Sequence, residues 1–279
     1  MHPNNMTVWD KIECIRGCGG HVVRQHVPIK LDGPTGYTDC TDIPHRFARE
    51  FLLNVWDTNV HPVDGGPYCP AHDAVSETIL SRGVWEPRET TLMMQVCSTA
   101  NMGDVMIDMG AQLGWYSLIA ATFGLSVIAF EADPANAALL TQNFLLNDML
   151  HLLTLHNTRI GRRTLPIELD SHVRFVKIDL EGAELDAVMM LSSYLQDKTI
   201  DHMMIEVSPC FDDYYPNLVT SIMRMGYRAF MLPPKRRPPI QLDTPEVALK
   251  PYELVHNVKT RVASWHQEDV WFMREDATW

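Results

Sequence analysis

The segment VMIDMGAQLGWYS, Val105–Ser117, joins an apolar run to a helical pattern through a glycine-containing turn. Asp108 lies just before the turn, and the turn runs from Gly110 to Gly114. Glycine lets the backbone approach a ligand closely, and the first N–H groups of the helix that follows are free to bind one. We therefore predict a ligand at this turn, contacted by Asp108, Gly110, Ala111, Gln112 and Gly114.

The residues of the turn discriminate between two kinds of adenosine-containing ligand. A dinucleotide site typically has the pattern G-x-G-x-x-G, which places a pyrophosphate on the helix N-terminus. Here the middle glycine is absent, and the Asp108 carboxylate would repel a pyrophosphate but suit an ammonium group. S-adenosylmethionine has an amino-acid head and a sulfonium and lacks phosphate, so we predict it as the cofactor. An NAD-dependent oxidoreductase is the less favoured alternative.

A second acidic residue supports an adenosine ligand. Glu131 ends the next predicted strand, 21 residues after Gly110, and Ala132 follows it. An acid at this place can accept hydrogen bonds from both ribose hydroxyls. A solvated strand end and glycines that serve only a tight turn are the structural alternatives. Because the turn, Asp108 and Glu131 occur in register, we favour the cofactor interpretation.

Further cofactor contacts are expected from residues near the predicted strand ends, including Ala132 and Asp179. Tyr116 and Ser117 open the helix after the turn and are candidates for the methionine carboxylate, although Tyr116 also suits a core position. Asn157 and Thr158 follow the third strand and are candidates for the adenine. Glu86 lies upstream and is a weaker candidate for the methionine end.

A second group of charged residues surrounds the segment VKIDLEGAE. Strand alternation places Lys177 and Asp179 on one side, and Glu181 and Glu184 begin the next helix. Glu206 ends the neighbouring strand. We predict catalytic roles, as general base or substrate anchor, for Asp179, Glu181, Glu206 and Lys177. The structural alternatives are favourable charges at a helix N-terminus and a buried pair between Lys177 and Glu206.

The sequence offers two candidate metal sites and requires neither. Carboxylates at Asp179, Glu181 and Glu206 could bind a divalent metal such as Mg²⁺. The N-terminal region also has cysteine and histidine residues that could supply a structural zinc, but their spacing matches no strong zinc pattern and free thiols are the alternative. These residues are Cys14, Cys18, His21, Cys40, Cys69 and His72.

The elements that must position these residues alternate between strand and helix. The predicted strands are Val105–Met109, Leu125–Phe130, Leu152–Leu155, Arg174–Ile178, His202–Val207, Tyr227–Leu232 and Asp269–Met273. The predicted helices are 73–83, 86–98, Leu113–Phe123, Pro134–Asn147, Ala183–Leu195 and Leu218–Met225. This alternation predicts an α/β fold with a mostly parallel sheet and helices on both faces. The last two strands lack a helical crossover, so we expect them to be antiparallel.

Two segments fall outside this alternation. Residues 1–72 are rich in turn-forming residues, and we expect an irregular extension with one helix over Arg46–Trp56 that packs on the main domain and contributes to the substrate site. The main domain is then 73–279. Within it, the proline-rich stretch 233–268 is expected to form a lid or substrate loop before the last strand.

The motifs together resemble those of a known family. The stretch from VMIDMGAQLG to FEADPANAALLTQNFLLN, followed by VRFVKIDLEGAELDAVM and MMIEVSP, resembles the FkbM-type S-adenosylmethionine-dependent methyltransferases. The resemblance covers about 73–232 and the last strand, and KIDLEGAE is its most specific part. It implies a Rossmann-type, seven-stranded class I methyltransferase sheet and O-methylation of sugars, glycolipids or polyketide-type hydroxyls. It says little about 1–72 or 233–268.

Composition restricts the partners and the compartment. The 279 residues have a formal net charge of -12, which argues against nucleic acid as the main partner and favours a small-molecule or glycan acceptor. A transmembrane span and a signal peptide are not expected, so we expect a cytoplasmic enzyme. A non-catalytic S-adenosylmethionine-binding protein is the main alternative. Nothing in the sequence indicates an oligomeric state.

Overall fold

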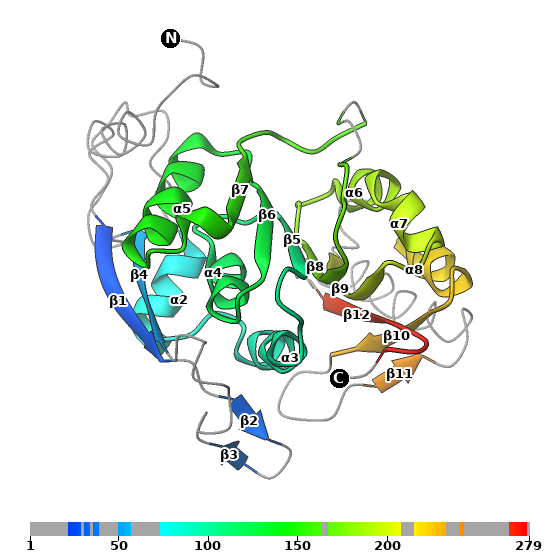
Figure 1. Ribbon diagram of the computed structural model, residues 1–279, viewed down its shortest axis with the longest axis horizontal. Helices are drawn as coiled ribbons and strands as arrows, with labels where there is room; N and C mark the ends of the chain where they lie inside the picture. The colour runs from blue at the N-terminus through cyan, green and yellow to red at the C-terminus, as the bar shows by residue number, and fades with distance from the viewer. Residues whose placement is uncertain are drawn as a thin grey trace, which may run out of the picture. The chain divides into compact units, whose positions relative to one another are not determined.

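The structure is a computed structural model (Figure 1). It describes residues 22–28, 31–33, 36–38, 50–56, 73–162, 164, 167–207, 215–232, 240–242 and 268–277. The zinc candidates Cys14, Cys18, His21, Cys40, Cys69 and His72 lie outside these residues, as does most of 233–268. In the described ranges, no helix is both long and apolar enough to cross a membrane.

The chain divides into two units, 1–159 and 160–279. In the first unit, strands β5 (Val105–Met109), β6 (Ser126–Phe130) and β7 (Leu153–His156) pair in parallel, with β6 in the middle. The helices of this unit are α2 (Ala74–Arg82), α3 (Pro87–Ser98), α4 (Trp115–Thr122), α5 (Pro134–Leu146) and the short 3₁₀ helix η3 (Leu150–Leu152). Their order confirms the predicted alternation.

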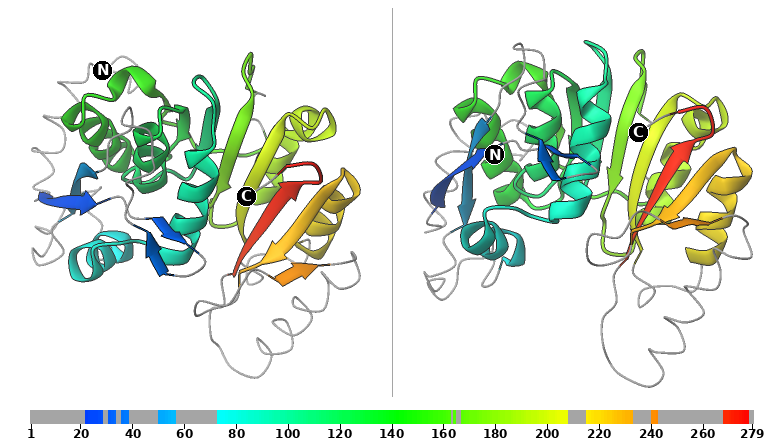
Figure 2. Two further views of the ribbon diagram at one scale, coloured as in Figure 1. Left: turned by 60° about the horizontal axis from the view of Figure 1, so that its bottom comes forward. Right: turned by 90° about the horizontal axis from the view of Figure 1, so that it is seen from below.

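The second unit has a mixed sheet. β8 (Val173–Ile178) pairs in parallel with β9 (Ile200–Val207), and β12 (Glu268–Arg274) is antiparallel to β9. β10 (Tyr227–Met231) is antiparallel to β12, as predicted, and β11 (Ile240–Leu242) adds an unpredicted strand beside β10. Figure 2 shows these strands side by side. The helices are α6 (Glu184–Met190), α7 (Ser192–Gln196) and α8 (Tyr215–Arg224).

All seven predicted strands are present, and the fold class, a mostly parallel Rossmann-type sheet with helices, is confirmed. Strands β5 and β8 are buried along their whole length, as parallel strands covered on both faces should be.

Two helix ends are set by residues next to them in the sequence. Asp133 caps α5 by accepting from the N–H groups of Ala135 and Asn136, and Gly83 ends α2 in the left-handed conformation.

The predicted helix over Arg46–Trp56 is wrong for the part that the structure describes. Residues Glu50–Trp56 form strand β4, which pairs in antiparallel fashion with β1 (Val22–Pro28). The short strands β2 (Leu31–Gly33) and β3 (Gly36–Thr38) form a second pair. The extension is therefore not uniformly irregular. In a short apolar run, the sequence pattern does not distinguish a strand from a helix, because pairing with another strand decides which of them forms.

The predicted helix Ala183–Leu195 is interrupted. The chain forms α6 and then α7, with Leu191 between them. Leu191 is fully buried, and no proline or glycine marks the break in sequence. The interruption therefore has no local signal that a sequence pattern could show.

Candidate functional site

The turn between β5 and α4 requires unusual backbone conformations. Gly110 and Gly114 have φ of 91° and 92°, and Gln112 between them has φ of 47°. A side chain at Gly114 would also meet Leu140 of α5, because a Cβ there would lie 2.9 Å from Leu140 Cγ. Glycine at this position is thus needed both for its backbone angle and for the close approach of α5.

The turn is fastened to the end of β6. The N–H groups of Gly110 and Ala111 donate to the carbonyl oxygen of Phe130, at 2.9 and 3.0 Å. The N–H of Gln112 donates to Oε2 of Glu131 at 2.7 Å, and Oε1 of Glu131 accepts from the N–H of Asp133 at 2.8 Å. The predicted ribose ligand Glu131 and the predicted turn therefore lie in direct contact.

Glu131 is buried, with 8% of its surface exposed. Burial raises the pKa of its carboxyl, the two backbone N–H donors oppose the rise, and the charges of Asp133 and Asp108 add to it. The Asp108 side chain is 1% exposed and accepts a 2.6 Å hydrogen bond from the Ser117 hydroxyl. Ser117 was predicted to contact the cofactor, and in this structure it orients Asp108. Two buried acids thus flank the turn.

Two residues from helix N-termini support the turn from the upstream side. Asp73, the N-cap of α2, accepts a hydrogen bond from the Gln112 side chain as well as from the Ser76 N–H. Glu86, the residue before α3, accepts from the Tyr116 hydroxyl and has a left-handed φ of 41°. Tyr116 is 6% exposed.

The third strand end supports Glu131 from the other side. Nδ2 of Asn157 donates to the carbonyl oxygens of Glu131 at 2.8 Å and of Ala132 at 3.4 Å. Thr158 is exposed, and its N–H donates to the His156 carbonyl oxygen at 2.9 Å. The structure therefore gathers Asn157 with Glu131, and it leaves Thr158 at the surface.

In the second unit, Lys177 is the centre of a charged group. It is 2% exposed, and its Nζ lies 3.2 Å from Oδ2 of Asp179 and 3.6 Å from Oδ1 of Asp269. The predicted placement of Lys177 and Asp179 on one side of β8 is confirmed. Asp269 was not predicted as a site residue. It lies opposite Glu206 in the β12–β9 register. The sequence pattern could not place it beside Lys177, because that position depends on how β12 pairs with β9.

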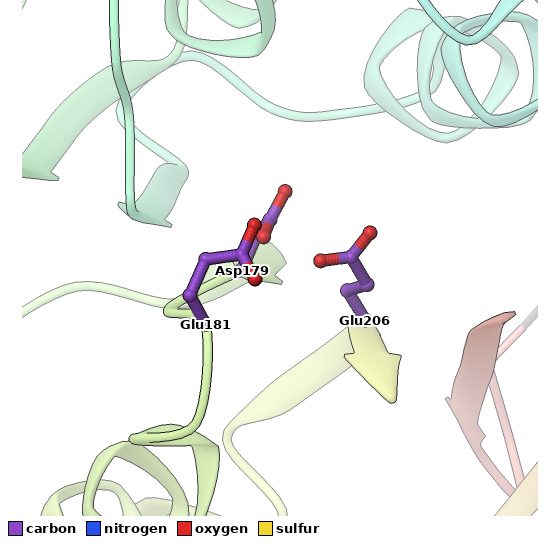
Figure 3. A group of neighbouring side chains, drawn as sticks. All are labelled: Asp179, Glu181 and Glu206. Carbon is purple, nitrogen blue, oxygen red and sulfur yellow. The ribbon is translucent and has the colours of Figure 1, made fainter. Parts of the chain in front are cut away.

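Three of the predicted catalytic residues converge. The carboxylates of Asp179, Glu181 and Glu206 have oxygen atoms within 4.8 Å of one another, and Figure 3 shows the side chains pointing toward one another. Glu181 has a left-handed φ of 52°. Glu184 has a different role, since its buried carboxylate accepts from the N–H groups of Leu180 and Gly182 at 3.1 Å and so holds the loop that carries Glu181.

The acids of this cluster differ in protonation. Burial raises the pKa of Glu206 to about 10, and the Asp179 charge adds to the rise. Burial also works against ionisation of Asp179, but the Lys177 ammonium and a hydrogen bond with Glu206 outweigh it and lower the Asp179 pKa. Burial raises the pKa of Asp269, against the pull of Lys177. At neutral pH the cluster thus combines an ionised Asp179 with a protonated Glu206.

Comparisons with known proteins returned structures but no close relatives. No protein-family model matches the chain, and no curated protein matches it. Among solved structures, an rRNA methylase from Streptococcus thermophilus aligns with 13% identity and a TM-score of 0.45, over 68% of this chain and 99% of that one. The human methyltransferase 10 domain containing protein aligns with 13% identity and a TM-score of 0.44, over 72% and 94%.

A third solved structure is a precorrin-6y C5,15-methyltransferase from Geobacter metallireducens GS-15. It aligns with 12% identity and a TM-score of 0.41, over 76% of this chain and 97% of that one. All three structures share 13% sequence identity or less with this chain.

Proposed function

We propose that the protein is an S-adenosylmethionine-dependent methyltransferase. One observation carries the proposal: Asp108 and Glu131 are both buried and both flank the glycine turn on which a dinucleotide would lay its pyrophosphate. Two carboxylates in a poorly solvated place oppose a phosphate and favour a cation. S-adenosylmethionine brings an ammonium and a sulfonium to such a site.

In the proposed complex, Glu131 accepts hydrogen bonds from the ribose hydroxyls. Its two oxygens are already oriented by the N–H groups of Gln112 and Asp133, and each carboxylate oxygen has a further lone pair for a hydroxyl. Asp108, oriented by Ser117, faces the amino-acid end. Ala111 is part of the turn, and its N–H donates to the Phe130 carbonyl oxygen. Asn157 supports the strand end by donating to the Glu131 carbonyl oxygen.

We further propose that the acceptor is a hydroxyl of a sugar-containing or small natural-product molecule. The resemblance of KIDLEGAE to the FkbM-type enzymes supports this assignment. The cluster supports it too, because Asp179, Glu181 and Glu206 converge there and the Lys177 ammonium already pairs with Asp179 and Asp269. A carboxylate-rich site of this kind disfavours a phosphodiester chain.

In the proposed reaction, the acceptor oxygen attacks the methyl carbon of the sulfonium in line with the carbon–sulfur bond. The oxygen–carbon bond forms as the carbon–sulfur bond breaks, and the sulfur keeps the electron pair. The hydroxyl proton passes to ionised Asp179, while Lys177 keeps that carboxylate ionised and protonated Glu206 holds it by a hydrogen bond. Positioning contributes most, because the donor is already activated.

Calorimetric titration of the purified protein with S-adenosylhomocysteine, NAD⁺ and ATP tests the donor. We expect S-adenosylhomocysteine to bind and the two phosphate-containing ligands not to. Binding of NAD⁺ without S-adenosylhomocysteine would instead assign the chain to the oxidoreductases.

Transfer of a labelled methyl group tests the acceptor, with a panel of glycosides and polyols compared against total RNA. Labelling of RNA alone would overturn the hydroxyl acceptor but leave the donor assignment intact. Donor binding with no transfer to any acceptor would favour the non-catalytic alternative.

A further inference from the structure

Helix α5 holds strand β4 through two asparagine side chains. Oδ1 of Asn143 accepts from the N–H of Asn54 at 2.7 Å, and its Nδ2 donates to the Asn54 carbonyl oxygen at 3.0 Å. Asn147 repeats the pattern one turn later, since it accepts from the N–H of Leu52 and donates to its carbonyl oxygen, both at 2.7 Å. Each amide thus pairs with one strand residue as a neighbouring peptide group would.

The spacing explains why this pairing works. Residues four apart on a helix are separated by about 6 Å along its axis, and residues two apart on a strand by about 6.8 Å. Asn143 and Asn147 therefore match alternate residues of β4, whose same-side backbone groups point toward α5. Because only backbone atoms of β4 take part, the contact fixes the strand's position and register whatever its side chains.

Asn143 has an additional partner in the cofactor turn. Its Nδ2 also donates to the carbonyl oxygen of Leu113 at 2.9 Å, and Asn143 is fully buried. Leu113 immediately precedes Gly114, which is in contact range of Leu140. One amide therefore joins β4, α5 and the turn. Within the part of the chain that the structure describes, Asn147 makes no corresponding hydrogen bond to the turn, and its Nδ2 donates to β4 and to the Asn143 carbonyl oxygen.

A second connection runs from β4 to the same turn. The N–H of Trp56 donates to the hydroxyl of Ser76 in α2 at 3.0 Å, and its indole Nε1 donates to Oδ1 of Asn136 at 2.9 Å. Asp73 caps α2 through Ser76 and also accepts from Gln112 of the turn. Strand β4 is thus connected to the turn at Gln112 as well as at Leu113.

We propose that Asn143 is a positioning residue for cofactor binding and that β4 belongs to the cofactor-binding machinery through it. The inference rests on the proposed function, because it names what holds the turn that would bind S-adenosylmethionine. A turn with three left-handed residues in five needs external support to keep its conformation. The Asn143 amide of α5 supplies that support and links the turn to β4, a strand far away in sequence.

The test compares Asn143→Asp with Asn147→Asp as the matched control. Each change keeps the shape and the acceptor, removes the Nδ2 donor and introduces a carboxylate, and only the first removes a bond to the turn. We expect Asn143→Asp to raise the dissociation constant of S-adenosylhomocysteine by about tenfold. We expect Asn147→Asp to leave that constant within about twofold, although both variants lower the urea midpoint. Equal effects of the two variants on affinity would overturn the inference.

A measurement on the unaltered protein covers the case in which Asn143→Asp does not fold. Hydrogen exchange with and without S-adenosylhomocysteine is followed by mass spectrometry, and coupling predicts slower exchange in β4 as well as in 105–117. Protection confined to the turn would overturn the inference. If the unaltered protein bound no S-adenosylhomocysteine, the proposed function would fail, whereas a faster-exchanging turn in Asn143→Asp alone would still support the coupling.

Discussion

Glu131 at the end of β6 reaches back to the preceding turn, where its Oε2 accepts a 2.7 Å hydrogen bond from the N–H of Gln112. One carboxylate therefore both shapes the turn and offers remaining lone pairs to a ligand. The N–H groups of Gln112 and Asp133 stabilise the ionised form of this acid at 8% exposure, although burial and the neighbouring charge of Asp108 raise its pKa.

Replacing Glu131 with glutamine tests this acid as the ribose ligand. Hydrogen bonds to a charged acceptor are worth about 1.5–3 kcal/mol, so Glu131→Gln should weaken S-adenosylhomocysteine binding by about 10- to 100-fold. Calorimetry measures the affinity, with exposed Glu77→Gln on α2 as the control. Because the ionised form is the better acceptor, binding to the unaltered protein should also weaken as pH falls toward the raised pKa of Glu131. Unchanged affinity in Glu131→Gln would remove the residue from the site.

Substitutions at two glycines distinguish the cost of a strained backbone conformation from the cost of steric crowding. Gly103 and Gly114 have φ of 89° and 92°, but a Cβ at Gly103 would meet nothing within 4 Å, whereas one at Gly114 would meet Leu140 Cγ at 2.9 Å. Gly103→Ala should cost about 1–2 kcal/mol of unfolding free energy from its left-handed conformation alone. Gly114→Ala should cost more and should also weaken cofactor binding. Urea denaturation measures the difference, and equal losses would show that α5 yields to the added methyl group.

The Glu206 carboxyl predicts a pH-dependent stability. Its folded pKa of about 10 lies above the ordinary value of 4.5, so the folded state binds the extra proton between these values. Its burial therefore costs increasing stability as pH rises from about 4.5 to about 10. Glu206→Gln, which is neutral and keeps a donor, should melt at a higher temperature than the unaltered protein at pH 8 and differ less at pH 5.

Thermal melts across this range measure the Glu206 effect, with exposed Asp170→Asn as the control. A difference that does not depend on pH would show that Glu206 is ionised in the folded protein.

Asp179 is the group that we expect to accept the hydroxyl proton. Asp179→Asn should lower the rate of methyl transfer by about 10²- to 10⁴-fold, the usual contribution of a general base. The affinity for S-adenosylhomocysteine should stay within about twofold if the residue acts on the acceptor. Single-turnover transfer of a labelled methyl group provides the rate. A variant that transfers methyl groups normally would leave Asp179 only its ion pair with Lys177.

Removal of divalent metal distinguishes proton transfer from metal binding at the same cluster. Asp179, Glu181 and Glu206 have the oxygen atoms that Mg²⁺ prefers, within 4.8 Å of one another. If Lys177 and the proton on Glu206 already offset the negative charge of the cluster, no metal ion is needed there, and EDTA should leave the transfer rate unchanged. A loss of activity that Mg²⁺ restores would assign these carboxylates to a metal ion instead.

Local features of the fold could be predicted from sequence because their causes are local. Asp133 before Pro134 predicts the start of α5, and Gly83 predicts the end of α2. The alternation of apolar strands with helices predicts the parallel sheet. The place of Glu131 beside the glycine turn could be predicted too. The sequence puts Glu131 at the end of a strand, and the carboxyl ends of parallel strands lie at one edge of the sheet.

Features that depend on distant partners could not be read in this way. The apolar pattern before Trp56 suits a helix, but pairing with β1 and with the amides of Asn143 and Asn147 makes it a strand. The break at Leu191 likewise has no local signal.

By itself, the sequence determined the seven predicted strands, the glycine turn and the acids at the strand ends, because neighbours in the chain control those features. Only the tertiary structure decided that Asp269 joins Lys177 and that Asn143 connects β4 to the glycine turn. Those contacts join residues far apart in the chain. Their formation depends on packing and on the need to satisfy buried polar groups, which a pattern of residue types does not encode.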